Sequence, residues 1–352
     1  MTATPIDLDK ISEEELLNSK ICDLPLSIDG MWLNECVQEL YGELKSKGIV
    51  FNPLCYLAEE WLTPENEPVI GIPFYLAHPT LIKLEKKMML EAEGETKAWC
   101  MKLLRHEAGH ALCYAYHLNK KRSWQKVFGL SSKNYGDTYR FQPYSKRFVR
   151  HLDGFYAQYH PDEDFVETFA VWLTPDSNWQ DKYKGWKALD KLKFVDDLMR
   201  DIQGQPPVVA QGTKYWYFKK LKITLKKFYR KRRKFAEEDF PDFYDSQLKK
   251  IFKPLTLQEY KEEKKNNKDL IFAADFLKKY HRSIVYNTQR STGERTYIIT
   301  DLLKRITERC RQMNMVVTQT QIEAAICVAV YVASLIMNYM HTGWFRGKRL
   351  KR

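Results

Sequence analysis

The sequence predicts an α+β fold that is mostly helical, with a small sheet in the first half of the chain and a helical C-terminal region. The chain has 352 residues, of which 44% are hydrophobic and 14% aromatic, so it can bury a sizeable core and form two packed domains. Apolar residues recur at helical spacing in several long segments. Residues 68–76, in contrast, have the length and composition of a strand.

The first part of the chain provides an arm, one helix and the strand. Residues 1–28 are a polar arm. Residues 29–47 have an apolar face of helical period that stops at Gly48, a residue suited to end a helix. In the strand at 68–76, Pro73 has no N–H group and therefore restricts the strand to the edge of a sheet.

A second helix is predicted over residues 95–117, where alanine and leucine dominate and no proline occurs. It contains His106-Glu107-Ala108-Gly109-His110, which fits the His-Glu-x-x-His pattern. Two histidines four residues apart share one helix face, so both imidazoles can bind one Zn²⁺ at about 2.0–2.1 Å. Glu107 can then take a proton from water, whose pKa zinc lowers to about 7.

The alternative is a helix with two hydrogen-bonded core histidines and an exposed glutamate. Gly109 is unfavourable inside a helix by about 1 kcal/mol relative to alanine. A close backbone neighbour packed over Gly109 would explain why glycine stands there.

A catalytic zinc needs three protein ligands and one open position. Residues 159–173 supply the best candidates, because Pro161 followed by acids begins a helix that carries Glu163 and Glu167 one turn apart. One carboxylate can bind zinc while the other orients a ligating histidine. Alternatively, the acids interact with the helix dipole, which accounts for Glu163 better than for Glu167.

A third histidine is a competing ligand, and His151 and His160 are the candidates. The histidine that the metzincin spacing requires is absent, because Cys113 and Tyr116 follow His110 without a histidine at that position.

The two motifs together resemble the gluzincin arrangement of thermolysin-like metallopeptidases. The segments around them, residues 105–112 and 160–173, resemble a family of zinc-binding metallopeptidases. The resemblance is strongest between residues 69 and 200. It implies a zincin-like fold and peptide-bond hydrolysis, with Glu107 as general base, Glu163 as third ligand and Glu167 as supporting acid. The reverse assignment of the two glutamates stays open.

The resemblance also implies an edge strand just before the active-site helix, and such an edge can pair with an extended peptide substrate. The alternative is that residues 68–76 form an ordinary sheet strand, and the two are compatible. A hydrolase of this kind needs a donor for the developing oxyanion. Tyr156 and Tyr159 precede the acid helix, and we predict Tyr159 in this role.

Charge is concentrated in one segment of the chain. The net charge is +12, and residues 211–234 contain eleven lysines and arginines but no acid. Aromatic residues are interleaved with them, as in surfaces that hold phosphates and stack bases. This predicts a possible nucleic acid or anionic surface as partner. The alternative is a solvated basic face whose aromatic residues are buried: Trp216, Tyr217, Phe218, Phe228 and Tyr229.

Localisation is predicted to be cytoplasmic. Residues 1–24 are acidic and lack the features of a signal peptide, and the seven cysteines form no Cys-x-x-Cys pair. Residues 324–337 are apolar, but a membrane span needs about 20 residues, so we expect a buried helix and no transmembrane segment. The basic end at 348–352 keeps membrane association open.

These features predict four segments. They are a polar arm (1–28), a zincin-like metallopeptidase domain (29–204), a basic linking segment (205–240) and a helical C-terminal domain (241–352). Helices are expected at 186–199, 269–280, 295–313 and 318–340. The predicted function is a zinc-dependent peptidase that acts on a peptide or protein substrate. The alternative is a non-catalytic zinc protein that associates with nucleic acid or a protein partner through its basic segment.

Overall fold

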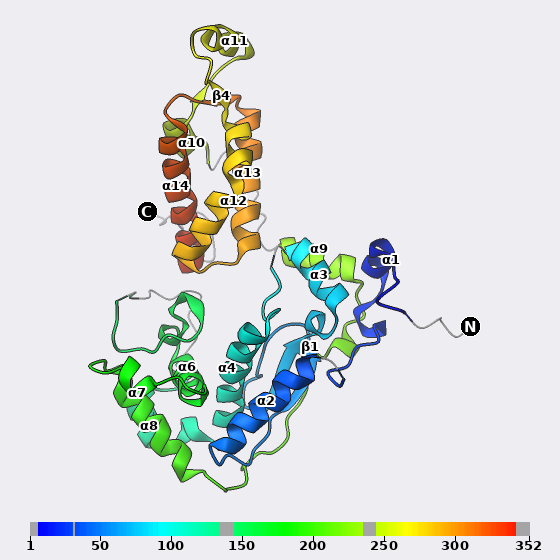
Figure 1. Ribbon diagram of the computed structural model, residues 1–352, viewed down its shortest axis with the longest axis vertical. Helices are drawn as coiled ribbons and strands as arrows, with labels where there is room; N and C mark the ends of the chain where they lie inside the picture. Colours follow the sequence, from blue (N-terminus) through cyan, green and yellow to red (C-terminus); the bar gives the residue numbers. More distant parts are fainter. Residues whose placement is uncertain are drawn as a thin grey trace. The chain divides into compact units, whose positions relative to one another are not determined.

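The computed structural model describes residues 6–30, 32–89, 91–133, 142, 144–234 and 244–342 (Figure 1). These ranges hold fourteen α-helices and five short strands, so the predicted α+β class is confirmed at this level. The chain forms two compact units. The first comprises Met1–Met88 and Ala92–Arg230, and the second comprises Met89–Glu91 and Lys231–Arg352.

Two helices form the centre of the first unit. α4 (Lys97–Ala115) packs against α6 (Pro161–Leu173), while α2 (Trp32–Ser46) contacts α4 and α8 (Ala188–Asp201) contacts α6 (Figure 1). The predicted helices at 29–47, 95–117 and 186–199 are thus confirmed to within a few residues. The shorter helices are α1 (Glu13–Asn18), α3 (Pro79–Met89), α5 (Arg122–Phe128), α7 (Trp179–Lys182) and α9 (Leu225–Lys234).

The small sheet of the first unit pairs β1 (Leu54–Ala58) in parallel with β2 (Val69–Pro73). The predicted edge position of this strand is confirmed, because the sheet has two strands, and an isolated bridge to Leu62 covers its free side at Gly71. On the side away from β1, Leu62 N–H donates to the Gly71 carbonyl at 3.2 Å and Gly71 N–H donates to the Leu62 carbonyl at 2.8 Å. A side chain at position 71 would run into Leu62, so glycine permits this approach.

The basic segment is built into the first unit as far as Arg230. Single backbone bridges join Tyr217 to Ala58 and Thr224 to Lys20. The rings of Phe218, Phe228 and Tyr229 are buried and unable to stack on bases, whereas Trp216 is 53% exposed. Binding of nucleic acid or an anionic surface stays a prediction that rests on the exposed cations, which are Lys219, Lys220, Lys222, Lys226, Lys227, Arg230 and Lys231.

The second unit is a helical bundle. α12 (Ala273–Thr292) packs against α13 (Thr296–Gln312) and α14 (Gln321–Thr342) around an apolar core. The helix predicted at 269–280 continues to Thr292, because Ile284 and Val285 keep its apolar face in that core. The other elements are α10 (Asp245–Ile251), α11 (Leu257–Asn266) and an antiparallel sheet of β3 (Lys253–Pro254), β5 (Met315–Val317) and β4 (Ile271–Phe272) in that order.

Within the described ranges, α14 is the one helix that is long and apolar enough to cross a membrane, between Gln321 and Met340. One such helix is weak evidence, because core helices have the same length and composition. One face of α14 packs in the core of the second unit through Ala324, Val328 and Val332. The expected absence of a transmembrane segment stays a prediction.

Candidate metal centre

The histidine motif lies in the buried middle of α4. The helix begins after Thr96, whose hydroxyl accepts a hydrogen bond from the Trp99 N–H group. His106 is 4% exposed, Glu107 7% and His110 9%, and the two imidazole rings lie 5.2 Å apart between centroids. Three polar side chains so close together in a core require partners, since burial of unpaired polar groups is unfavourable.

α4 is fixed to α2 by a buried ion pair next to the motif. Arg105 Nε donates to Glu43 Oε2 at 2.8 Å, and Arg105 Nη2 donates to Glu43 Oε1 at 2.5 Å. Both side chains are about nine-tenths buried. This paired geometry holds the helix turn that carries His106 in place.

α6 crosses α4 at Gly109. The helix begins with Pro161 in its first turn, and the His160 side chain accepts a hydrogen bond from Asp162 N–H at 3.2 Å. A Cβ atom at position 109 would lie 2.9 Å from Val166 Cβ and 3.0 Å from Val166 Cα. The prediction that a close backbone neighbour packs over Gly109 is therefore confirmed.

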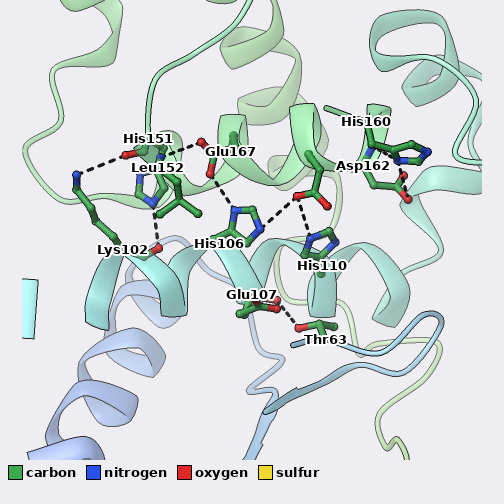
Figure 2. A network of polar contacts seen from close by, with 11 residues as sticks. Thr63, Lys102, His106, Glu107, His110, His151, Leu152, His160, Asp162 and Glu167 are labelled. Carbon is green, nitrogen blue, oxygen red and sulfur yellow. Dashed lines mark hydrogen bonds and ion pairs between the residues drawn. The ribbon is translucent and has the colours of Figure 1, made fainter. Parts of the chain in front are cut away.

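This crossing brings three donor atoms together (Figure 2). Glu163 Oε2 lies 3.3 Å from His106 Nε2 and 3.4 Å from His110 Nε2. All three donor atoms lie within 4.8 Å of one another. Two imidazole nitrogens and one carboxylate oxygen are ligands that zinc accepts, so the donor set fits the predicted ion.

Glu167 contacts His106 from the other side. Its Oε1 atom lies 2.8 Å from His106 Nδ1, and its Oε2 atom accepts a hydrogen bond from Leu152 N–H at 2.9 Å (Figure 2). Glu163 therefore faces the nitrogens of both histidines that point to the common centre, whereas Glu167 fixes the ring orientation of His106.

The two alternative histidines are not in this group. His151 Nε2 lies 2.9 Å from the Lys102 carbonyl, and His160 Nε2 lies 2.6 Å from the Lys133 carbonyl. His160 in addition caps α6. Both imidazoles thus have structural hydrogen bonds outside the donor group.

Burial and charge shift the pKa values of the group in opposite directions. Burial lowers the pKa of His106, but the carboxylates of Glu163 and Glu167 outweigh it and hold that pKa well above its usual value. Burial raises the pKa of Glu163, but His110 and His106 outweigh it and keep that pKa below its usual value. The charged forms of His106 and Glu163 therefore stabilise each other.

Glu107 points away from the donor atoms of its own helix. Burial raises the pKa of its carboxyl group above the usual value, with His106 and His110 acting in the opposite direction. Its Oε2 atom is buried and has no hydrogen-bond partner in the described part of the chain. The Thr63 hydroxyl donates to the Glu107 backbone carbonyl at 3.1 Å (Figure 2).

A cavity of about 470 Å³ opens onto His106, Glu107, His110 and Glu163. Its other walls come from three parts of the first unit. In the described part of the chain, they are the segment from Trp61 to Glu65 that pairs with Gly71, the residues after α5, and residues on α4, just before α6 and in the first turn of α6. These residues are Trp61, Leu62, Thr63, Glu65, Tyr114, Ser131, Ser132, Lys133, Tyr156 and Asp162.

Tyr159, the predicted oxyanion donor, is not among the residues that line this cavity. Its ring packs on Tyr156 at 5.9 Å, and Tyr156 in turn lies 5.6 Å from the His106 ring. Tyr114 also lines the cavity, and its place four residues after His110 on the same helix face was a usable sequence signal. Ser131 and Thr63 had no such signal, because they reach the cavity through loop conformation.

Comparison with known proteins adds no family assignment. Searches against protein-family profiles, curated proteins and solved structures found no match for this chain.

Proposed function

We propose that the chain is a zinc-dependent peptidase of the gluzincin type, with a zincin-like fold in residues 29–204. One observation supports this above all others. Three zinc-compatible donor atoms meet, and one cavity is lined both by their residues and by Glu107, whose buried Oε2 atom has no hydrogen-bond partner in the described part of the chain. A pair of structural core histidines would need neither the cavity nor the unpaired carboxylate oxygen.

In this proposal, His106, His110 and Glu163 hold the ion, and Glu167 orients His106. When bound, zinc would polarise the substrate carbonyl and lower the pKa of water to about 7.

Glu107 acts as the general base. Its carboxylate accepts a proton from the attacking water as the water oxygen bonds to the peptide carbonyl carbon. The same carboxyl group then gives the proton to the leaving amine as the carbon–nitrogen bond breaks. Burial, which raises the Glu107 pKa, makes the carboxylate a better base for this transfer. We assign the oxyanion hydrogen bond to Tyr156 in place of Tyr159, because Tyr156 lines the cavity.

The test is Glu107→Gln. We expect this variant to bind one equivalent of zinc, as measured by mass spectrometry of the metal, but to lose at least about a hundredfold of the activity on casein and a peptide library. The matched control is Glu35→Gln, at an exposed position on α2, which should keep both zinc and activity. Full activity of Glu107→Gln would exclude the assignment.

The same measurements separate the alternative function. If the wild-type protein binds zinc and cleaves none of the library, the chain is a non-catalytic zinc protein. If it binds no zinc at physiological concentration, neither zinc function holds.

A further inference from the structure

The cavity contains a carboxylate that the proposed hydrolysis does not use. Asp162 lies in the first turn of α6, one residue before Glu163, and is only 7% exposed. It lines the cavity together with Tyr114 and Ser131. An acid in this turn is stabilised by the helix dipole, but that explains neither its burial nor its place in the cavity wall.

Within the described ranges, one oxygen of Asp162 is held by hydrogen bonding and the other is not. Oδ2 accepts a hydrogen bond from Ser131 Oγ at 2.9 Å, and Ser131 Oγ accepts one from Asn119 Nδ2 at 3.2 Å. The His160 Nδ1 atom lies 3.6 Å from the same Oδ2. Oδ1 is buried and has no hydrogen-bond partner in the part of the chain that the structure describes.

The charges around the cavity favour a cation at this oxygen. Among the described residues that line the cavity are four carboxylates, one lysine (Lys133) and the two motif histidines, although the whole chain has a net charge of +12. Glu107 and Glu163 are taken up by the proposed metal chemistry. Asp162 remains, with Glu65 at the exposed rim.

Tyr114 completes the environment. It is 8% exposed, it lines the cavity, and its ring stacks on His110 with 6.3 Å between centroids. An aromatic ring next to a carboxylate suits an ammonium or guanidinium group, which contacts the ring face and donates to the oxygen.

We infer that Asp162, with Ser131 and Tyr114, forms a subsite for a cationic group of the peptide substrate. The group is a lysine or arginine side chain or a free amino terminus. Its N–H donor hydrogen-bonds to the Asp162 carboxylate, whose orientation Ser131 fixes. The inference rests on the proposed function, whose peptide it specifies, and it makes Asp162 a determinant of specificity.

Binding to the zinc-loaded Glu107→Gln protein tests the inference without any cleavage. The probes are alanine peptides with a single lysine at successive positions, and matched peptides with norleucine or glutamate there. Each peptide is prepared with a free and with an acetylated amino end, which separates a side-chain cation from a terminal one. We expect one lysine position or the free amino end to tighten binding about ten- to a hundredfold over norleucine, with glutamate weakest.

Adding Asp162→Asn should remove this preference and leave the zinc content and the binding of norleucine peptides unchanged. Asp190→Asn, an equal change of charge at an exposed position outside the cavity, should retain the preference. A second measurement does not depend on the folding of the Asp162 variant. It is the order of binding affinity of the lysine, norleucine and glutamate peptides for the protein in which Asp162 is intact.

Three outcomes overturn the inference. They are no preference for cationic peptides with Asp162 present, an unchanged preference in Asp162→Asn, and loss of zinc from Asp162→Asn. Failure of the proposed function is a separate result, because it shows as an absence of zinc or of cleavage in the wild-type protein.

Discussion

The two units bury different kinds of side chain. In the described part of the first unit, charged side chains and histidines are buried together, most of them where α4 meets α6. In the described part of the second unit, the buried polar side chains are threonines, such as Thr292 and Thr307, whose hydroxyls bond to carbonyls of their own helix. Apolar contacts alone suffice to hold three helices together, so the buried charge of the first unit needs another explanation.

Substitution of a histidine in each unit gives the largest contrast. We expect His110→Ala to lose stoichiometric zinc, with affinity lower by more than about a hundredfold, because one of the three proposed ligands is gone. His281→Ala, on α12 of the second unit, should bind zinc as the wild type does. Metal analysis after dialysis against a weak chelator measures the zinc content of both variants. Equal zinc content would show that a metal ion does not explain the buried charge of the first unit.

The ion pairs of the two units should differ in their contribution to stability. Glu43→Ala leaves Arg105 buried without its partner and should lower the free energy of unfolding of the first unit by roughly 3–5 kcal/mol. The comparable pair in the second unit, Asp245 with Arg309, is about one-fifth exposed, so Asp245→Ala should cost about 1 kcal/mol or less.

Denaturant titration can follow the first unit alone. Eight of the nine tryptophans precede residue 231, so tryptophan fluorescence reports on that unit, while hydrogen exchange reports on both. An equal loss of unfolding free energy in Glu43→Ala and Asp245→Ala would contradict the prediction that the more buried ion pair contributes more to stability.

Glu167 tests whether a buried acid that touches no metal still serves the site. Glu167→Gln keeps the shape of the side chain but removes the charge next to His106 Nδ1. We expect zinc affinity to fall about ten- to a hundredfold, measured by competition with a chromophoric chelator. Glu35→Gln is again the control. If Glu167→Gln kept the zinc affinity of the wild type, Glu167 would contribute to packing alone.

The smallest expected effect separates two glycines inside helices. Gly42→Ala on α2 meets nothing within 4 Å and should stabilise the first unit by about 1 kcal/mol. Gly109→Ala gains the same helix propensity but forces α6 away from α4, at a cost of about 1–3 kcal/mol. The temperature of thermal unfolding should therefore rise for Gly42→Ala and fall for Gly109→Ala, and zinc affinity should fall for Gly109→Ala alone. A stabilised Gly109→Ala with normal zinc affinity would contradict the close crossing.

Local patterns predicted the elements that carry the site. The motif helix, the acid helix that begins at Pro161 and the neighbour over Gly109 follow from spacing, capping and glycine propensity. Spacing alone left Glu163 and Glu167 equivalent, because both lie on one face a turn apart. Their different contacts depend on how α6 crosses α4, which is a tertiary property.

The contacts that local patterns did not predict have the same origin. Leu62 pairs with Gly71 on the free side of the edge strand, and no local signal marks this pairing. The partnership of Glu43 with Arg105 joins two helices, and only the arginine among apolar residues hinted at a buried partner. Tyr156 lies within a short 3₁₀ helix (Asp153–Gln158) and lines the cavity, whereas Tyr159 follows that helix and does not, and residue type does not specify this difference.

The close approach at Gly109 also bears on how such a chain can diverge. The backbone between the two histidines touches Val166, and the same helix positions Glu163 one turn earlier. A larger residue at 109 is acceptable only with a smaller one at 166, so the two positions are expected to change in concert among related sequences. A mutational scan of both positions together would detect this epistasis as pairs that are tolerated jointly and rejected singly.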